Sequence, residues 1–297
     1  MDKNLYIYSY LAGYIEGDGY IGVPKFPGER FKSGRLKYPT IQIAFPTKDL
    51  PLAQFFLTII GKGSLLKKKG VNAYILTFNN KESILFIAKA ICNYMRTPKI
   101  NSLNELLCYY NLQPVSLTEN CLSLDAWLAG FIDADGSFQV RSSNLKNNFN
   151  LLNSPCVSNE RGFSEKNKKF SRFSCSFELS QRFMDKSGDP LYPILNKIGI
   201  FLKTNVKQTV KRKNELRIKT NSLLSNNILL NYLKTYPLLS SKHLDFLDWC
   251  QVLKIVEAKN HKLESGKKEI IKLKLKMNNN RTDFNWDHLT SIWGKLI

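Results

Sequence analysis

Two acidic residues occupy matching positions in a segment that occurs twice in this chain. Residues 11–19 (LAGYIEGDG) return at 128–136 as LAGFIDADG, with six of the nine positions identical. A repeated segment of this kind predicts two copies of one fold. Each copy carries one equivalent carboxylate, Asp18 or Asp135. A pseudo-twofold axis between the copies would bring the two carboxylates together.

The sequence around each carboxylate favours a bound cation. Apolar residues at helical spacing precede both aspartates, and Gly19 stands where a helix-ending glycine belongs, so each aspartate is expected at a helix C-terminus. The helix dipole disfavours a carboxylate there by about 0.3–1 kcal/mol, and two adjacent carboxylates repel each other. Mg²⁺ or a similar hard ion prefers oxygen ligands and relieves both penalties. Glu16 and Asp133 lie about 200° around the helix from the aspartates, so we predict surface or capping roles for these two acids.

Small residues recur four positions apart on each repeated helix. Gly13 and Gly17 form one such pair, and Gly130 and Ala134 form the other. Glycine inside a helix costs about 1 kcal/mol relative to alanine, so its presence needs a structural reason. Close approach of the two helix backbones supplies that reason. We therefore expect the repeated helices to pack directly against each other.

The composition indicates a folded and strongly basic protein. The chain has 297 residues, enough for two domains, and 43% of them are hydrophobic. Its 44 Lys and Arg outnumber 24 acids, a net charge of +20, which favours a polyanionic partner over a merely soluble basic protein. No apolar run approaches the length of a membrane span. The six cysteines form no C-x-x-C pair and the three histidines do not cluster with them, so buried free thiols are expected rather than zinc sites or disulfides.

Periodicity predicts the same order of elements on both sides of an aperiodic linker at 115–124. We expect an N-terminal repeat at 1–114, and a C-terminal repeat with a helical tail at 125–297. The expected helices are 5–18, 52–60, 81–94, 102–112, 125–136, 190–198, 222–235 and 243–258. The expected strands and hairpins are 20–23, 40–45, 63–78, 137–141, 172–180 and 204–220. The tail from residue 262 is basic and low in complexity, and it ends in an amphipathic packing helix to which we assign no chemistry.

Paired carboxylates flanked by basic two-stranded units indicate phosphodiester hydrolysis. A metal held by the carboxylates would lower the pKa of a bound water and stabilise the leaving oxygen. A curved sheet that is basic on one side fits a DNA major groove, as β-ribbons do. Lys and Arg would contact phosphates, and polar strand residues would contact base edges. The expected DNA contacts are Lys25, Arg30, Arg35, Lys37, Gln42, Lys67, Lys68, Lys69, Gln139, Arg141, Arg172, Ser174, Ser176, Glu178, Arg182, Lys207, Lys211, Arg217 and Lys219.

The two motifs and the duplicated element order resemble the LAGLIDADG homing endonucleases of the single-chain, two-motif type. The resemblance covers nearly the whole chain. It implies an α+β fold of two pseudosymmetric αββαββα repeats, in which each four-stranded antiparallel sheet forms half of a DNA-binding saddle. It also implies a monomer that recognises a long asymmetric duplex and cuts both strands across the minor groove, leaving 3′ overhangs. Mg²⁺ or Mn²⁺ would support cleavage, and Ca²⁺ would occupy the site without supporting it.

The resemblance assigns further site residues by their position in the motifs. The last acid of each motif binds metal, which maps to Asp18 and Asp135, with the backbone carbonyl of Gly17 or Ala134 as an additional ligand. A glutamine after the second strand belongs to the active site; it is present as Gln181, and Thr47 occupies its place in the first repeat. A lysine between the last two helices of each repeat, Lys99 or Lys242, would organise water or stabilise the phosphorane.

Two other functions remain open on the same fold. An RNA-splicing maturase needs the same basic surface, so intron RNA is an alternative partner. A catalytically inert DNA-binding regulator is the third hypothesis, although the intact motif acids argue against it. The segment 144–169 is an extended DNA-contacting loop or a disordered insertion. Abundant Lys, Asn, Ile, Leu and Tyr suggest an AT-rich organellar genome, most readily a mitochondrial one, and no obligate protein partner is expected.

Overall fold

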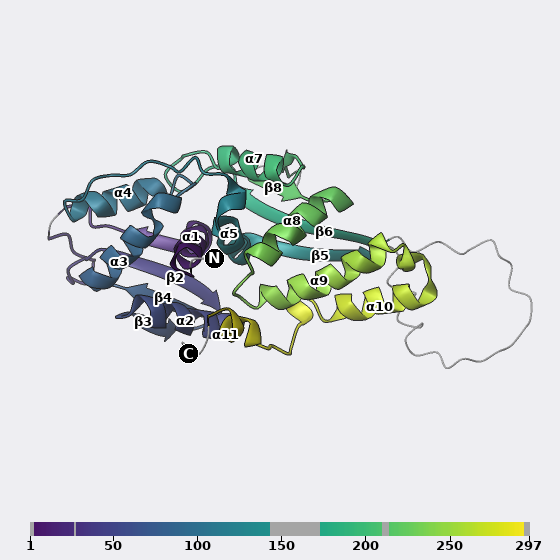
Figure 1. Ribbon diagram of the computed structural model, residues 1–297. Helices are drawn as coiled ribbons and strands as arrows, with labels where there is room; N and C mark the ends of the chain where they lie inside the picture. The colour runs from purple at the N-terminus through teal and green to yellow at the C-terminus, as the bar shows by residue number, and fades with distance from the viewer. Residues whose placement is uncertain (1–2, 27, 143–172, 210–213, 294–297) are drawn as a thin grey trace, which may run out of the picture.

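The structure is a computed structural model that describes residues 3–26, 28–142, 173–209 and 214–293 (Figure 1). The expected contacts Arg172 and Lys211 and the insertion 144–169 lie outside the described residues. No helix in the described part of the chain is long and apolar enough to cross a membrane. The five described cysteines are all unpaired, but only Cys175 is buried, because Cys108 and Cys121 are exposed and Cys92 and Cys250 are partly covered.

Both repeats contain the expected elements in the expected order. In the first repeat these are α1 (Lys3–Asp18), β1 (Gly19–Gly22), β2 (Thr40–Pro46), α2 (Leu50–Ile60), β3 (Ser64–Lys67), β4 (Ala73–Phe78), α3 (Lys81–Ile91) and α4 (Ile100–Tyr109). In the second repeat they are α5 (Trp127–Asp135), β5 (Gly136–Ser142), β6 (Phe173–Arg182), α7 (Tyr192–Phe201), β7 (Val206–Gln208), β8 (Glu215–Lys219), α8 (Leu223–Thr235) and α9 (Lys242–Glu257). The tail contains α10 (Glu264–Leu275) and α11 (Asp287–Trp293).

Each repeat builds one antiparallel four-stranded sheet from its described strands, in the order β1-β2-β4-β3 and β5-β6-β8-β7. Alternation decides which face is buried: Ile41, Ile43 and Phe45 on β2 are fully buried, and Gln42 between them is partly exposed. In the second sheet Phe138 on β5 packs 5.5 Å from Trp249 of α9, measured between ring centroids. One face of each sheet therefore packs on the core and the opposite face stays open.

Helices α1 and α5 lie side by side between the two sheets (Figure 1). The strands β1 and β5 follow them without an intervening turn, so Gly19 is the first residue of β1 and not a left-handed helix cap as expected. Glycine is required at this position for a different reason. A Cβ on Gly19 would lie 2.7 Å from the carbonyl oxygen of Ile15.

The tail is more ordered than its lysine-rich composition predicts. Residues 264–275 form helix α10, which packs on α9 and buries Ile270, Ile271 and Leu273. Arg281 then bonds to Asp245 at 2.9 Å and to Asp248 at 2.5 Å, both on α9. The expected packing helix is present as α11, whose Leu289 is fully buried.

A histidine pair joins α11 to the start of α9 and makes stability depend on pH. The rings of His243 and His288 stack with centroids 4.3 Å apart. Burial, and then the neighbouring His288, lower the pKa of His243 from 6.5 to about 4. The unfolded chain therefore binds the proton more readily, so stability is complete above pH 6.5 and is lost as the pH falls towards 4.

We expect His243→Gln to weaken this pH dependence. The urea unfolding midpoint of the wild-type protein should fall between pH 6.5 and 4 more steeply than that of the variant. His261 lies outside this pair of stacked rings, so His261→Gln serves as the control. Identical slopes in the wild type and His243→Gln would contradict the assignment.

Candidate active site

The contact between α1 and α5 leaves no room for side chains at the glycines. A Cβ on Gly13 would lie 1.9 Å from the carbonyl oxygen of Trp127, and a Cβ on Gly130 would lie 2.0 Å from that of Tyr10. A Cβ on Gly17 would lie 2.3 Å from the Cβ of Ala134. The expected seam of small residues is therefore present, and the backbones touch across it.

The seam brings Asp18 and Asp135 to one place, at the adjacent C-terminal ends of the two helices. A Cβ on Gly17 would lie 2.9 Å from Oδ2 of Asp135, so this carboxylate faces the last turn of α1. Surrounding protein atoms, and then the charge of Asp135, raise the pKa of Asp18 from 3.8 to about 6, although its side chain remains open to solvent. Burial also raises the pKa of Asp135. Both carboxylates thus lie where a negative charge is costly and a cation would be stabilised.

Lys99 and Lys242 each close the end of one motif helix. Lys99 Nζ donates to the carbonyl oxygens of Ile15 at 2.8 Å, Glu16 at 2.9 Å and Gly19 at 2.7 Å. Lys242 Nζ donates to those of Ile132 at 3.2 Å, Asp133 at 2.6 Å and Ala134 at 2.9 Å. Carbonyls at a helix C-terminus lack partners within the helix and carry a partial negative charge. The two ammonium groups therefore satisfy the helix ends that present the aspartates.

The electrostatics show that both repeats build one site. Burial and the charge of Asp135 have the largest effects on the pKa of Asp18, and both raise it. The positive charges of Lys242 in the second repeat and then Lys99 in the first repeat lower it. Burial lowers the pKa of both lysines, and both aspartates oppose this change. Each aspartate therefore interacts with a lysine from each repeat across the seam.

Glu16 and Asp133 are not surface acids, contrary to the prediction. Glu16 accepts hydrogen bonds from Thr97 Oγ1 at 2.6 Å, from the Thr97 backbone N–H at 2.5 Å and from Trp127 Nε1 at 2.5 Å. Asp133 accepts from the backbone N–H of Leu239 at 2.7 Å and from Ser240 Oγ at 2.5 Å. Each acid points away from the motif aspartate, as the helical geometry predicted, but it points into the core. There it binds the segment that leads to Lys99 or Lys242 and so holds each lysine against its helix.

The second repeat adds a side chain that the first repeat lacks. Gln181, on β6, donates from Nε2 to Oδ2 of Asp135 at 2.6 Å. Thr47 directly follows β2, and its hydroxyl is buried without a hydrogen-bond partner in the described part of the chain. The structure therefore brings Gln181 to the aspartates and leaves Thr47 without a contact to them. The two halves of the site are unequal.

The open sheet faces carry most of the expected DNA contacts. Cross-strand pairing places Gln139 opposite Ser176, Arg141 opposite Ser174, and Lys219 opposite Glu178 on one face of the second sheet. Ser176 is only 1% exposed, so neighbouring side chains cover it and it is not available as a base contact. Glu178 binds Arg141 at 2.7 Å and Lys219 at 2.8 Å, so it orients cations on this face.

The remaining expected contacts are on the surface, chiefly in loops and hairpins. Lys37 pairs with Glu29 in the β1–β2 loop, which limits its freedom to bind phosphate. Gln42 lies on the open face of the first sheet, and Arg217 on that of the second. The exposed residues among all the expected contacts are Lys25, Arg30, Arg35, Lys67, Lys68, Lys69, Ser174, Arg182 and Lys207.

Comparison with known proteins decides the family. A sequence model described as LAGLIDADG endonuclease matches residues 11–110 and 128–253, which together make up most of the chain. The chain belongs to the LAGLIDADG endonuclease family. Its two matched segments indicate the single-chain form with two motifs.

The relatives of this LAGLIDADG protein include enzymes and a maturase. The intron-encoded DNA endonuclease aI3 of Saccharomyces cerevisiae is 28% identical over 305 residues, which cover 96% of this chain and 72% of that protein. The intron-encoded RNA maturase bI4 of the same yeast is 29% identical over 140 residues, 46% of this chain and 20% of the maturase. The structure of the I-SmaMI LAGLIDADG homing endonuclease bound to cleaved DNA superposes with a TM-score of 0.67 at 20% identity, covering 92% of this chain and 97% of that chain. This last likeness shows that the fold is shared.

The donor set of this LAGLIDADG site fits a hard divalent cation only in part. Asp18 and Asp135 supply carboxylate oxygens, and a cation would relieve the desolvation and repulsion that raise their pKa values. The described residues contain no group of three His, Cys, Asp or Glu side chains that would hold a metal ion. The carbonyl oxygens of Gly17 and Ala134, expected as further ligands, accept hydrogen bonds from Lys99 Nζ at 3.4 Å and Lys242 Nζ at 2.9 Å, and each keeps a second lone pair. Water and substrate phosphate would complete the coordination.

Some residues near the site gave no signal in the sequence. Lys186, in the β6–α7 segment, lies 5.8 Å from the ring centroid of Tyr20 in the first repeat. Asp49, after β2, is buried and accepts a hydrogen bond from the backbone N–H of Ser241 at 2.8 Å, next to Lys242. Both contacts join one repeat to the other. Contacts of this kind depend on how the halves dock, which local periodicity does not reveal.

Proposed function

We propose that this chain is a site-specific double-strand DNA endonuclease that cuts a long asymmetric duplex across the minor groove and leaves 3′ overhangs. The convergence of Asp18 and Asp135 at the seam, with Lys99 and Lys242 behind them, carries the proposal. The aI3 relative is itself named a DNA endonuclease, and I-SmaMI has been solved on cleaved DNA. The open basic faces of the two sheets supply the surface on which a duplex would lie.

The chain's own residues divide the work of phosphodiester hydrolysis. Asp18 and Asp135 would hold Mg²⁺ or Mn²⁺, which supplies an activated water and charge stabilisation when bound. Lys99 and Lys242 neutralise the helix ends and keep positive charge beside the phosphate that undergoes attack. Gln181 fixes the orientation of the Asp135 carboxylate through its hydrogen bond. Glu16 and Asp133 act at a distance, because they position the two lysines.

A cleavage assay tests this function directly. Purified protein with Mg²⁺ should cut one site in DNA of its host locus that lacks the intron, and both strands should be cut. In Ca²⁺ it should bind the same fragment without cutting it. Binding in Ca²⁺ combined with no cleavage in Mg²⁺ or Mn²⁺ would contradict the proposal.

The inequality of the two halves gives a further prediction. Gln181→Ala should slow single-turnover cleavage about 10- to 100-fold, since groups that orient a metal ligand typically contribute this much. Thr47→Ala should change the rate by less than about threefold, because its hydroxyl has no described partner. Equal losses in the two variants, measured under saturating protein, would show that the structure misassigns this asymmetry.

An RNA maturase is the second candidate function, because bI4 is named as one and aligns with 46% of this chain. Both functions would use the basic surface, so salt dependence does not separate them. Stimulation of intron self-splicing that survives Asp18→Asn, together with no DNA cleavage by the wild type, would favour the maturase.

We further propose that the protein acts as a monomer in the mitochondrion. Its two motifs complete the site within one chain, so a second copy is not needed. The relatives are intron-encoded, among them a cox1 intron-2 protein of Schizosaccharomyces pombe that is 28% identical over 271 residues, covering 89% of this chain and 70% of that protein. Sedimentation of the free protein and of its complex with a single duplex checks the monomer.

A further inference from the structure

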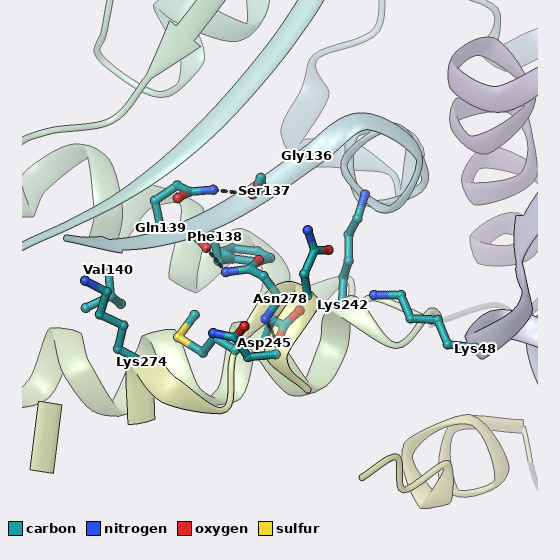
Figure 2. A pocket seen from close by; sticks show the side chains of 13 residues that line it. Lys48, Gly136, Ser137, Phe138, Gln139, Val140, Lys242, Asp245, Lys274 and Asn278 are labelled. Atoms are coloured by element: carbon teal, nitrogen blue, oxygen red, sulfur yellow. Dashed lines mark hydrogen bonds between the residues drawn. The ribbon is translucent and has the colours of Figure 1, made fainter. Parts of the chain in front are cut away.

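A cavity of about 460 Å³ lies at the free edge of β5, beside the active site (Figure 2). This volume is in the range of about 300–1,000 Å³ that is typical of ligand pockets. Its walls come from β5, the start of α9, the end of α10, the turn after α10, and Lys48 of the first repeat. The cavity shares Lys242 with the active site, but residues 274–280 lie beyond residue 253, where the family match ends.

The cavity is positively charged, because three lysines and one carboxylate line it. Lys48 and Lys242 lie at one end and Lys274 at the other (Figure 2). Lys48 lies 6.0 Å from the ring centroid of Phe284, and Lys274 Nζ lies 3.4 Å from Ser142 Oγ. Among the described residues, no carboxylate forms an ion pair with Lys48 or Lys274. Burial lowers the pKa of Lys274, and a bound anion would reverse that effect.

Asp245, the acidic residue that lines the cavity, already accepts hydrogen bonds from other residues of the chain. Asp245 Oδ1 accepts a hydrogen bond from Arg281 Nε at 2.9 Å and one from the backbone N–H of Asn278 at 3.0 Å. The Asn278 side chain donates to the carbonyl oxygen of Phe138 at 3.0 Å and fastens the turn to β5. Asn279 and Asn280 follow with exposed amides, each of which carries two N–H donors. The cavity therefore presents cations and neutral donors to whatever enters it.

The position of the cavity beside the open face of the second sheet indicates which anion it would bind. Gln139 lines the cavity and belongs to the open face that also carries Arg141 and Lys219. A duplex on that face must carry one of its backbones past the edge formed by β5. The corresponding edge of the first sheet, β1, contacts α4 as β5 contacts α9, but α4 is followed by the linker and not by a helix and turn like α10 and residues 276–280. The tail residues that line the cavity therefore have no counterpart among the described residues of the first repeat.

We propose that this cavity binds one backbone phosphate of duplex DNA, held by Lys274 and the amides of Asn279 and Asn280, on the side of the second repeat alone. The proposal rests on the proposed function in so far as DNA is the substrate. It assigns residues 274–280 of the tail a role in DNA binding, which the sequence had not indicated. A clamp on one side would also fix the direction in which the enzyme lies on an asymmetric site.

Phosphate ethylation interference tests the proposal with the full chain bound in Ca²⁺ to a duplex selected for binding from a randomised library. With the wild type, ethylation of a defined set of phosphates should block binding. With Lys274→Gln, ethylation of one of these phosphates, on one strand, should no longer affect binding. The Kd of this variant should rise about threefold to tenfold on the selected duplex and on an unrelated one alike. The slope of log Kd against log salt should become about 0.9 less steep.

Matched variants make the result decisive. Lys272→Gln removes an equal charge from the exposed side of the same helix and should change neither the interference pattern nor the salt slope. Lys274→Arg should retain the wild-type interference pattern and salt slope. The double variant Asn279→Ala with Asn280→Ala should reduce the interference at the same phosphate without disturbing the fold. An unchanged pattern in Lys274→Gln, or a dependence on Lys274 seen with single-stranded RNA only, would overturn the proposal. Wild-type protein that binds DNA but never cuts it would defeat the endonuclease proposal, while this binding test would remain valid.

Discussion

Asp18→Asn and Asp135→Asn should each abolish cleavage while DNA binding is kept or tightened. The substitution retains the shape of the side chain but removes the charge that would hold the metal. Metal-assisted charge stabilisation contributes several kcal/mol, and each 1.36 kcal/mol is a factor of ten in rate. The rate should therefore fall by at least about 10³-fold. Binding should not weaken, because a negative charge beside the DNA phosphates is removed.

The measurement is single-turnover cleavage in Mg²⁺ together with Kd in Ca²⁺ for each variant. Glu82→Gln is the control: it removes one negative charge from an exposed surface pair with Lys62 and should leave both quantities unchanged. Both strands should be affected by either substitution, because the two carboxylates meet at one seam. A variant that still cut one strand at the wild-type rate would contradict a centre shared by both aspartates.

The sequence predicted the frame of the site well because the frame depends on local patterns. Helical spacing before each aspartate, and alternation on the strands, follow from backbone geometry, so α1, α5 and both sheets appear where expected. The glycines also predicted the seam correctly, since a helical glycine needs a close neighbour. The family resemblance pointed to Lys99, Lys242 and Gln181, and the structure places all three beside the motif helices.

The wrong predictions concern which residues are buried, because burial depends on contacts between segments that are distant in the sequence. Helical geometry gave the direction of Glu16 and Asp133 correctly, but it did not show that the segments before Lys99 and Lys242 pack there. A helical tail was expected, but the bounds of α10 were not predicted because lysines obscured its apolar spacing, although Ile270 and Leu273 stand three residues apart, as on one helix face. Ser176 alternates onto the open face as predicted, yet its neighbours cover it. Periodicity predicts the direction in which a side chain points, but it does not predict whether neighbouring side chains bury it.

Gly13→Ala should destabilise the protein strongly, against the usual effect of such a change. Alanine raises helix propensity by about 1 kcal/mol over glycine, so an isolated helix would be stabilised. Here the new methyl would lie 1.9 Å from the carbonyl oxygen of Trp127 and 2.8 Å from the backbone N of Phe131. Backbone atoms in packed helices cannot yield as a flexible side chain can, so α1 and α5 must move apart. We expect a net loss of about 3 kcal/mol and a fall in Tm of about 5–10 °C.

Two further variants identify the seam as the cause. Gly130→Ala opens the same seam from the other helix, with its methyl 2.0 Å from the carbonyl oxygen of Tyr10, so the double variant should lose less than the sum of the two single losses. Gly17→Ala meets side-chain atoms, the Cβ of Ala134 at 2.3 Å and Oδ2 of Asp135 at 2.9 Å; adding Ala134→Gly removes the closer of these contacts and should recover much of the stability. Additive losses, or no recovery, would show that the helices do not touch as described. Because the same seam sets the separation of Asp18 and Asp135, cleavage by Gly13→Ala should fall even at temperatures where circular dichroism shows the variant fully folded.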